Sequence, residues 1–151
     1  IPSMDALECA IHFARGLRAE LMLVHVLEPA HSDWDLNRTE EHAHIHTSWE
    51  ARLKELVDEA KALGVLASYD IRGGLPADSI LAGALQHQCD LIVMGTHGRQ
   101  GRDREKVGSV AEGVLKQANC PVLTVKNSKF LPGGRRSISN ALVQQDNVKR
   151  Y

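Results

Sequence analysis

The sequence predicts one α/β domain in which helices cover both faces of a doubly wound parallel β-sheet. Segments with helical spacing of apolar residues alternate along the chain with short apolar runs, an order typical of parallel sheets with helical crossovers. The apolar runs are nearly continuous, as expected for strands that are buried on both faces. A length of 151 residues suits a single domain with a full hydrophobic core.

The first half of the chain is predicted to alternate between helix and strand. Apolar residues at helical spacing predict a helix over residues 3–18, and the apolar run over 19–29 predicts a buried strand. A second helical stripe covers 41–63, and Gly64 stands where a C-terminal cap belongs. The alternating residues 65–71 then predict a half-exposed strand at a sheet edge.

The second half repeats this order. Residues 73–88 are predicted to form a turn and a helix with Pro76 in its first turn, where the missing N–H is harmless. An apolar strand is expected over 90–94, a helix over 108–118 and a last strand over 120–126. We therefore expect the sheet to be parallel, with right-handed crossovers.

The net charge, the cysteines and the length of the apolar runs indicate which partners and which cellular compartment to expect. The formal net charge of −1 gives no overall field toward nucleic acid or a membrane surface. Cys9, Cys89 and Cys120 are odd in number and lack metal-ligand spacing, which favours a reducing compartment. No apolar run is long enough to span a bilayer, and no signal-peptide pattern opens the chain. We expect a cytoplasmic protein without nucleic-acid or membrane partners.

The composition changes after residue 126. Residues 1–126 are predicted to form the domain, and residues 127–151 a basic C-terminal tail that contains a single acid, Asp146. The tail is expected to be disordered, to associate with a dimer, or to form a short helix around Ile138–Val143.

A glycine-rich, charged loop over residues 95–109 separates the strand 90–94 from the following helix. In open parallel sheets, ligands bind beyond the carboxyl ends of the strands. Ser109 and Glu112 have the S-x-x-E spacing of a capping box, and the free N–H groups of such a helix start favour a phosphate. A charged surface crossover is the alternative interpretation of this loop. The P-loop and dinucleotide fingerprints are both absent from the sequence.

The glycine spacing carries a resemblance to a known family. Gly95, Gly98, Gly108 and Ser109 reproduce the pattern G-2x-G-9x-G-[ST], which resembles the signature of the nucleotide-binding branch of the universal stress protein family. The flanking stretches "CDLIVMGTHGR" and "GSVAEGVLKQANCPVLTVK" are similar to that family as well, and the likeness covers roughly residues 3–126. It implies a Rossmann-like fold of the adenine nucleotide alpha hydrolase type.

The resemblance also implies a ligand, namely ATP or the related AMP or ADP, with Mg²⁺ bridging the phosphates. Val26 would pack near the adenine, and Met94 and Gly95 would line the base and ribose. The glycines and the start of the last helix would hold the phosphates. The implied binding set is Val26, Met94, Gly95, His97, Gly98, Arg99, Gly108, Ser109 and Val110.

Family members commonly form homodimers through antiparallel pairing of the last strand, here Pro121–Val125. The function that the resemblance implies is a stress-response switch controlled by nucleotide. A slow ATPase or nucleotide hydrolase is one alternative, although Asp103 and Glu105, the acids of the loop, are expected to be solvated. A family member that binds partners without nucleotide is the other alternative. We assign no catalytic residue.

One departure from the family pattern concerns the sheet. The family has a central first strand before the first helix, ending in an Asp that contacts the adenine, and the chain begins where that helix begins. A truncated or incompletely recorded N-terminus is the expected explanation, and the alternative is that the tail or another chain fills the gap. Without this strand, we expect unpaired backbone groups on the two neighbouring strands.

Histidines offer other candidate sites. His42, His44 and His46 form an H-x-H-x-H run that would suit Zn²⁺ or Ni²⁺ if a third ligand were fixed, but a solvated helix start is favoured and no metal site is assigned. His97 would be a general base in an enzyme, whereas the resemblance implies no catalytic role for it. His25 is interpreted as a hydrogen-bonded strand residue.

Overall fold

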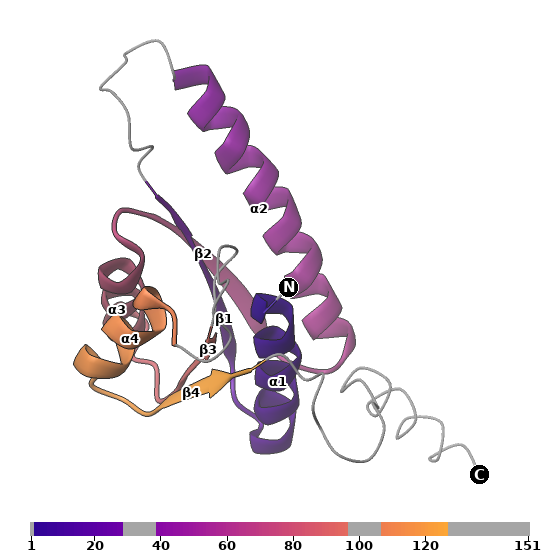
Figure 1. Ribbon diagram of the computed structural model, residues 1–151. Coiled ribbons are helices and arrows are strands. Elements are labelled where there is room, and N and C mark those ends of the chain that lie inside the picture. The colour runs from indigo at the N-terminus through magenta and orange to yellow at the C-terminus, as the bar shows by residue number, and fades with distance from the viewer. Residues whose placement is uncertain (1, 29–38, 97–106, 127–151) are drawn as a thin grey trace.

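The computed structural model describes residues 2–28, 39–96 and 107–126, within which helices and strands alternate (Figure 1). The elements are α1 (Pro2–Leu17), β1 (Leu21–Leu27), α2 (Thr39–Ala62), β2 (Ala67–Gly73), α3 (Pro76–Gln86), β3 (Ile92–Gly95), α4 (Ser109–Gln117) and β4 (Val122–Val125). The predicted order of elements is confirmed. The basic tail, 127–151, and most of the glycine-rich loop lie outside the described residues.

The junction between α2 and β2 shows why one predicted strand begins late. Gly64 takes a φ of +83° after the helix, which confirms its predicted role as a C-terminal cap. The N–H of Val65 then donates to the carbonyl of Ala60 at 3.1 Å, and the Val65 side chain is buried. Val65 therefore belongs to the helix end and the core, and β2 starts at Ala67.

The strands pair in parallel but form two separate sheets within the described residues. β1 pairs with β2, from Leu21 opposite Ala67 to Leu27 opposite Gly73, and β3 pairs with β4. A single continuous sheet is thus absent from the described ranges. The prediction that β1 is fully buried is wrong, because all of its residues are half-buried.

Helices cover both faces of the strands, as predicted. On one side α2 packs on β1 and β2, and α1 packs on β1, β3 and β4. On the other side α3 and α4 pack against each other and against strands of the two sheets, and Figure 1 shows them together, away from α2. None of the helices in the described ranges has both the length and the apolar character needed to cross a membrane.

The two helices α1 and α2 meet in a small apolar core. Ile11 and Ala14 of α1 contact Ala60 of α2 and Val65, with apolar residues at the starts of β1 and β2 packed around them. Because α1 contacts strands of both pairs, its apolar side connects the two sheets. Burial of this kind contributes about 25 cal/mol for each Å² of apolar surface removed from water.

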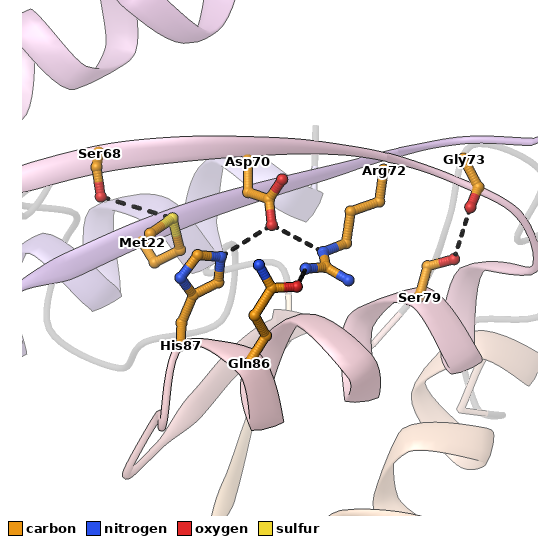
Figure 2. A network of polar contacts seen from close by, with 8 residues as sticks. All are labelled: Met22, Ser68, Asp70, Arg72, Gly73, Ser79, Gln86 and His87. Atoms are coloured by element: carbon orange, nitrogen blue, oxygen red, sulfur yellow. Dashed lines mark hydrogen bonds and ion pairs between the residues drawn. The ribbon is translucent and has the colours of Figure 1, made fainter.

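A polar network joins the C-terminal end of α3 to β2 (Figure 2). Oδ2 of Asp70 accepts a hydrogen bond from Nε of Arg72 at 2.8 Å and lies 2.9 Å from Nε2 of His87. Arg72 also donates to the side-chain oxygen of Gln86. The contact with His87 and then that with Arg72 lower the pKa of Asp70, although partial burial opposes the shift. The network therefore holds a charged carboxylate between strand and helix.

Replacing this carboxylate should make stability depend less on pH. The lowered pKa of Asp70 stabilises the fold above its ordinary value of 3.8, and this contribution is lost as the pH falls through the lowered value. We expect Asp70→Asn to lower the free energy of unfolding at pH 7 by about 1 kcal/mol and the difference to shrink below pH 3.8. Urea unfolding at a series of pH values measures it.

Asp58→Asn, at an exposed position of α2, is the matched control, and it should change stability by less than about 0.5 kcal/mol. A difference between Asp70→Asn and the parent protein that stayed constant down to pH 3 would contradict this role of the carboxylate.

Candidate functional site

The candidate site lies where β3 ends and α4 begins. Gly95 is the last residue of β3, and the next residue, Thr96, is 2% exposed. The N–H of Thr96 donates to the carbonyl of Val125 at 3.1 Å, and its carbonyl accepts from the N–H of Gly108 at 2.7 Å. The start of α4 is therefore held by a backbone hydrogen bond at the carboxyl end of β3.

The first turn of α4 presents backbone donors at this point. Gly108 is the N-cap, with extended φ and ψ of −65° and 153°, and the first bond of the helix runs from the N–H of Glu112 to the Gly108 carbonyl at 2.9 Å. The N–H groups of Ser109, Val110 and Ala111 precede that bond, so they have no acceptor within the helix. Together with the positive end of the helix dipole, they form an environment that suits an anion.

The predicted capping box is wrong. Ser109 is the first residue of the helix and not its cap, and no side chain among the described residues caps this helix end. Glu112 reaches the other way, and its Oε1 accepts from Nζ of Lys116 at 2.6 Å; this contact lowers the pKa of Glu112. The physical reason is that the glycine N-cap has no side chain. The donors of the first turn are thus not occupied by a capping side chain.

The structure brings most of the described candidate residues together at this point. Met94 and Gly95 form the end of β3, opposite Thr124 and Val125 of β4. The start of α4 follows directly from the bond between Gly108 and Thr96. The residues gathered here are Met94, Gly95, Gly108, Ser109 and Val110. The other loop candidates, His97, Gly98 and Arg99, lie outside the described residues.

Val26 belongs to the other strand pair. It is half-buried and lies one residue before the end of β1, opposite Arg72 of β2. It is therefore at the carboxyl end of its strand, as a ligand-binding residue of a parallel sheet should be. Its position beside an adenine stays a prediction.

Thr96 is a residue that the sequence analysis did not single out. It is a buried polar residue, and its backbone carries both the bond to β4 and the bond to the start of α4. A hydroxyl residue directly after an apolar strand was the available signal, but the donor for its carbonyl lies 12 positions further along the chain.

Histidines and a tryptophan on α2 and β1 form a different feature. The imidazole of His25 stacks on the indole of Trp49, with ring centroids 3.8 Å apart and an interplanar angle of 24°. Trp49 thus covers β1, in keeping with its half-buried position. His44, Ile45, Ser48 and Trp49 line a shallow hollow of about 210 Å³ on α2. The hollow involves none of the candidate residues at the end of β3.

The structure identifies no metal centre in its described part. No group of three or more His, Cys, Asp or Glu side chains there is placed to hold a metal ion. Nδ1 of His46 lies 4.0 Å from Oε2 of Glu50, and the side chain of His42 lies outside the described residues. The favoured interpretation of this run as a solvated helix start agrees with the exposure of His44 and His46.

Comparison with known proteins decides the family. The Universal stress protein family model matches residues 2–126. This chain belongs to the universal stress protein family. A universal stress protein of Methanocaldococcus jannaschii is 35% identical to it over 134 residues, covering 84% of this chain and 76% of that protein.

Solved structures of universal stress proteins share the fold. One in complex with cAMP is 26% identical, with a TM-score of 0.61, and the match covers 84% of this chain and 89% of that one. Another, from Archaeoglobus fulgidus in complex with dAMP, is 25% identical, with a TM-score of 0.54 and coverage of 80% and 85%. The fold of this universal stress protein is therefore that of its family, with parallel strands and helices on both faces.

Adding a negative charge to the start of α4 should stabilise the free protein. Ser109 is exposed in the first turn, where an acidic side chain interacts favourably with the helix dipole. We expect Ser109→Asp to raise the free energy of unfolding by about 0.3–1 kcal/mol at low salt, with a smaller gain at high salt. Thermal unfolding measures both.

Gln117→Glu, at the opposite end of the same helix, adds the same charge and should be neutral or slightly destabilising. Equal effects of the two variants would show that the donors at the start of α4 exert no directed field.

Proposed function

We propose that this universal stress protein binds ATP, or the related AMP or ADP, at the carboxyl end of β3, with the phosphates against the start of α4. The observation that carries the proposal is the 2.7 Å bond from the Gly108 N–H to the Thr96 carbonyl. It sets a helix start without a capping side chain directly beside the strand end, where α/β folds bind phosphates. The relatives with cAMP and dAMP support an adenine nucleotide.

In this proposal different parts of the chain contact different parts of the nucleotide. Val26 packs near the adenine, and Met94 and Gly95 line the base and ribose. Ser109 and Val110 would hold the phosphates through their backbone N–H groups. Gly108, whose N–H donates to the Thr96 carbonyl, places no side chain in their way, and Mg²⁺ would neutralise part of the phosphate charge. Gly98 would also hold the phosphates, and His97 and Arg99 complete the proposed binding set.

The biological role proposed is a cytoplasmic stress-response switch. A nucleotide that binds only the folded protein stabilises it by about 2.7 kcal/mol at a hundredfold excess over Kd. In this proposal, the bound nucleotide also alters the surfaces that partners or a second copy recognise. Turnover is not part of the proposal, because no described residue beside the start of α4 is assigned to position an attacking water.

A negative charge at the start of α4, which should raise the free energy of unfolding, should lower the affinity for ATP. Ser109→Asp places a carboxylate where the proposal places phosphates, so we expect it to weaken ATP binding by about tenfold or more. Binding of adenosine, which has no phosphate, should change by less than about threefold. Isothermal titration calorimetry with each ligand, in the presence of Mg²⁺, measures the difference.

Gln117→Glu is again the control, and its affinity for ATP should match that of the parent protein. Equal ATP affinities for Ser109→Asp and Gln117→Glu would exclude phosphate binding at the start of α4. No detectable binding of any adenine nucleotide by the parent chain would exclude the proposal as a whole.

The proposal includes a homodimer formed by antiparallel pairing of the last strand, Pro121–Val125. Within the described residues β4 pairs only with β3, so its other edge has backbone groups that a second copy can pair. The carbonyl of Pro121 accepts from Ile92 of β3, and that of Val125 accepts from Thr96, the residue after β3. Because backbone groups alternate in direction along a strand, the N–H of Thr124 points away from β3.

Proline at this outward position should therefore separate the dimer and leave β3 and β4 paired. We expect Thr124→Pro to convert dimers to monomers in light scattering, because proline removes an outward-facing donor. Leu123→Pro, which removes an inward-facing donor, should instead lower the thermal stability of the monomer. A Thr124→Pro protein that remained fully dimeric would exclude this edge as the interface.

A further inference from the structure

Two cysteines that are far apart in the sequence enter the same end of one strand pair. Cys89 lies between α3 and β3, and Cys120 lies between α4 and β4. The two strands run parallel with Ile92 opposite Val122, and the N–H of Ile92 donates to the carbonyl of Pro121 at 3.0 Å. Because this pairing begins just after both cysteines, the segments that carry them run side by side.

Each cysteine follows the fixed end of a helix. The N–H of Cys89 donates to the carbonyl of Ala84 in α3 at 2.8 Å, and the N–H of Ala118 donates to that of Val114 in α4 at 2.9 Å. The two helices pack against each other, and Val114 is fully buried. The backbones beside the two thiols are thus held by the fold on the same side of the molecule.

Neither thiol is part of a disulfide in the structure, and both are partly accessible. Cys89 and Cys120 are both free and half-buried. Burial raises the pKa of Cys89, and negative charge on Cys120 and Asp90 raises it further. The two thiols lie in the segments that run side by side just before the paired residues Ile92 and Val122. Burial alone raises the pKa of Cys9, which has no cysteine acting on it.

We propose that Cys89 and Cys120 form a redox-active pair that a peroxide converts into an intrachain disulfide. One thiolate attacks the outer oxygen of the peroxide, so that an S–O bond forms, the O–O bond breaks and an alcohol or water leaves. The second thiol then attacks the sulfenic acid sulfur, an S–S bond forms and water leaves. The pair loses two electrons and the peroxide gains them.

Oxidation would constrain the part of the chain that holds the candidate nucleotide site. The ring closed by the disulfide runs from Cys89 to Cys120 and includes β3, the start of α4 and the rest of that helix. A closed ring lowers the entropy of the unfolded chain, which stabilises the folded state. This inference does not depend on nucleotide binding, because the same residues would be oxidised in the absence of a ligand.

Peptide mapping of the oxidised chain tests the pair directly. The fully reduced chain is treated with hydrogen peroxide, alkylated without reductant, and digested with trypsin. We expect linked peptides of residues 73–99 and 117–126, each of which holds one cysteine of the pair. Free thiols should fall from three to one per chain. Dithiothreitol should restore them, and the oxidised chain should melt about 5–10 °C higher.

Three variants provide matched controls. Cys9→Ser should retain the linked peptides and the rise in melting temperature, whereas Cys89→Ser and Cys120→Ser should lose both. The mapping of the parent chain is decisive even if one of these variants does not fold. Three results would each overturn the proposal. They are links from Cys9 to Cys89 or Cys120 as frequent as links between Cys89 and Cys120, links found only between chains, and oxidation to sulfinic acid without a disulfide.

Discussion

The hydrogen bond between the Gly108 N–H and the Thr96 carbonyl, 2.7 Å long, sets the geometry on which the candidate site depends. It joins the end of β3 to the beginning of α4 although the two residues are separated by the glycine-rich loop. Because Thr96 also donates to Val125 of β4, the helix start is tied to both strands of the pair. The site therefore rests on backbone groups, and its chemistry follows from where a helix begins.

Backbone hydrogen bonds hold the β3–β4 pair and the start of α4 together, but among the described residues no such bonds join the two strand pairs. β1 and β2 form one parallel pair and β3 and β4 another, with no pairing between them in the described ranges. Helix α1, which contacts strands of both pairs, provides the link. Helix packing therefore sets the position of Val26, on β1, relative to the β3–β4 pair. Met94 and Gly95 belong to that pair and share its hydrogen-bonded ladder with β4.

Local rules predicted many features correctly. Gly64 was predicted as a cap because helix ends favour glycine in the left-handed region, and its φ of +83° confirms this. Pro76 lies in the first turn of α3 as predicted. The capping box failed because S-x-x-E describes spacing alone, and the helix began at Ser109 itself, with Glu112 bound to Lys116. The first residue of this helix depends on a tertiary contact, the hydrogen bond from the Gly108 N–H to the Thr96 carbonyl.

The sequence by itself determined the alternation of helices and strands, the parallel pairing and the family, because periodicity and the glycine spacing are local properties of the chain. Only the tertiary structure decided which distant groups meet. Asp70 meets His87 across β2 and α3, Thr96 meets Gly108, and the segments of Cys89 and Cys120 run side by side through the β3–β4 register. Such contacts depend on strand pairing and helix packing, which bring together residues that no local pattern relates.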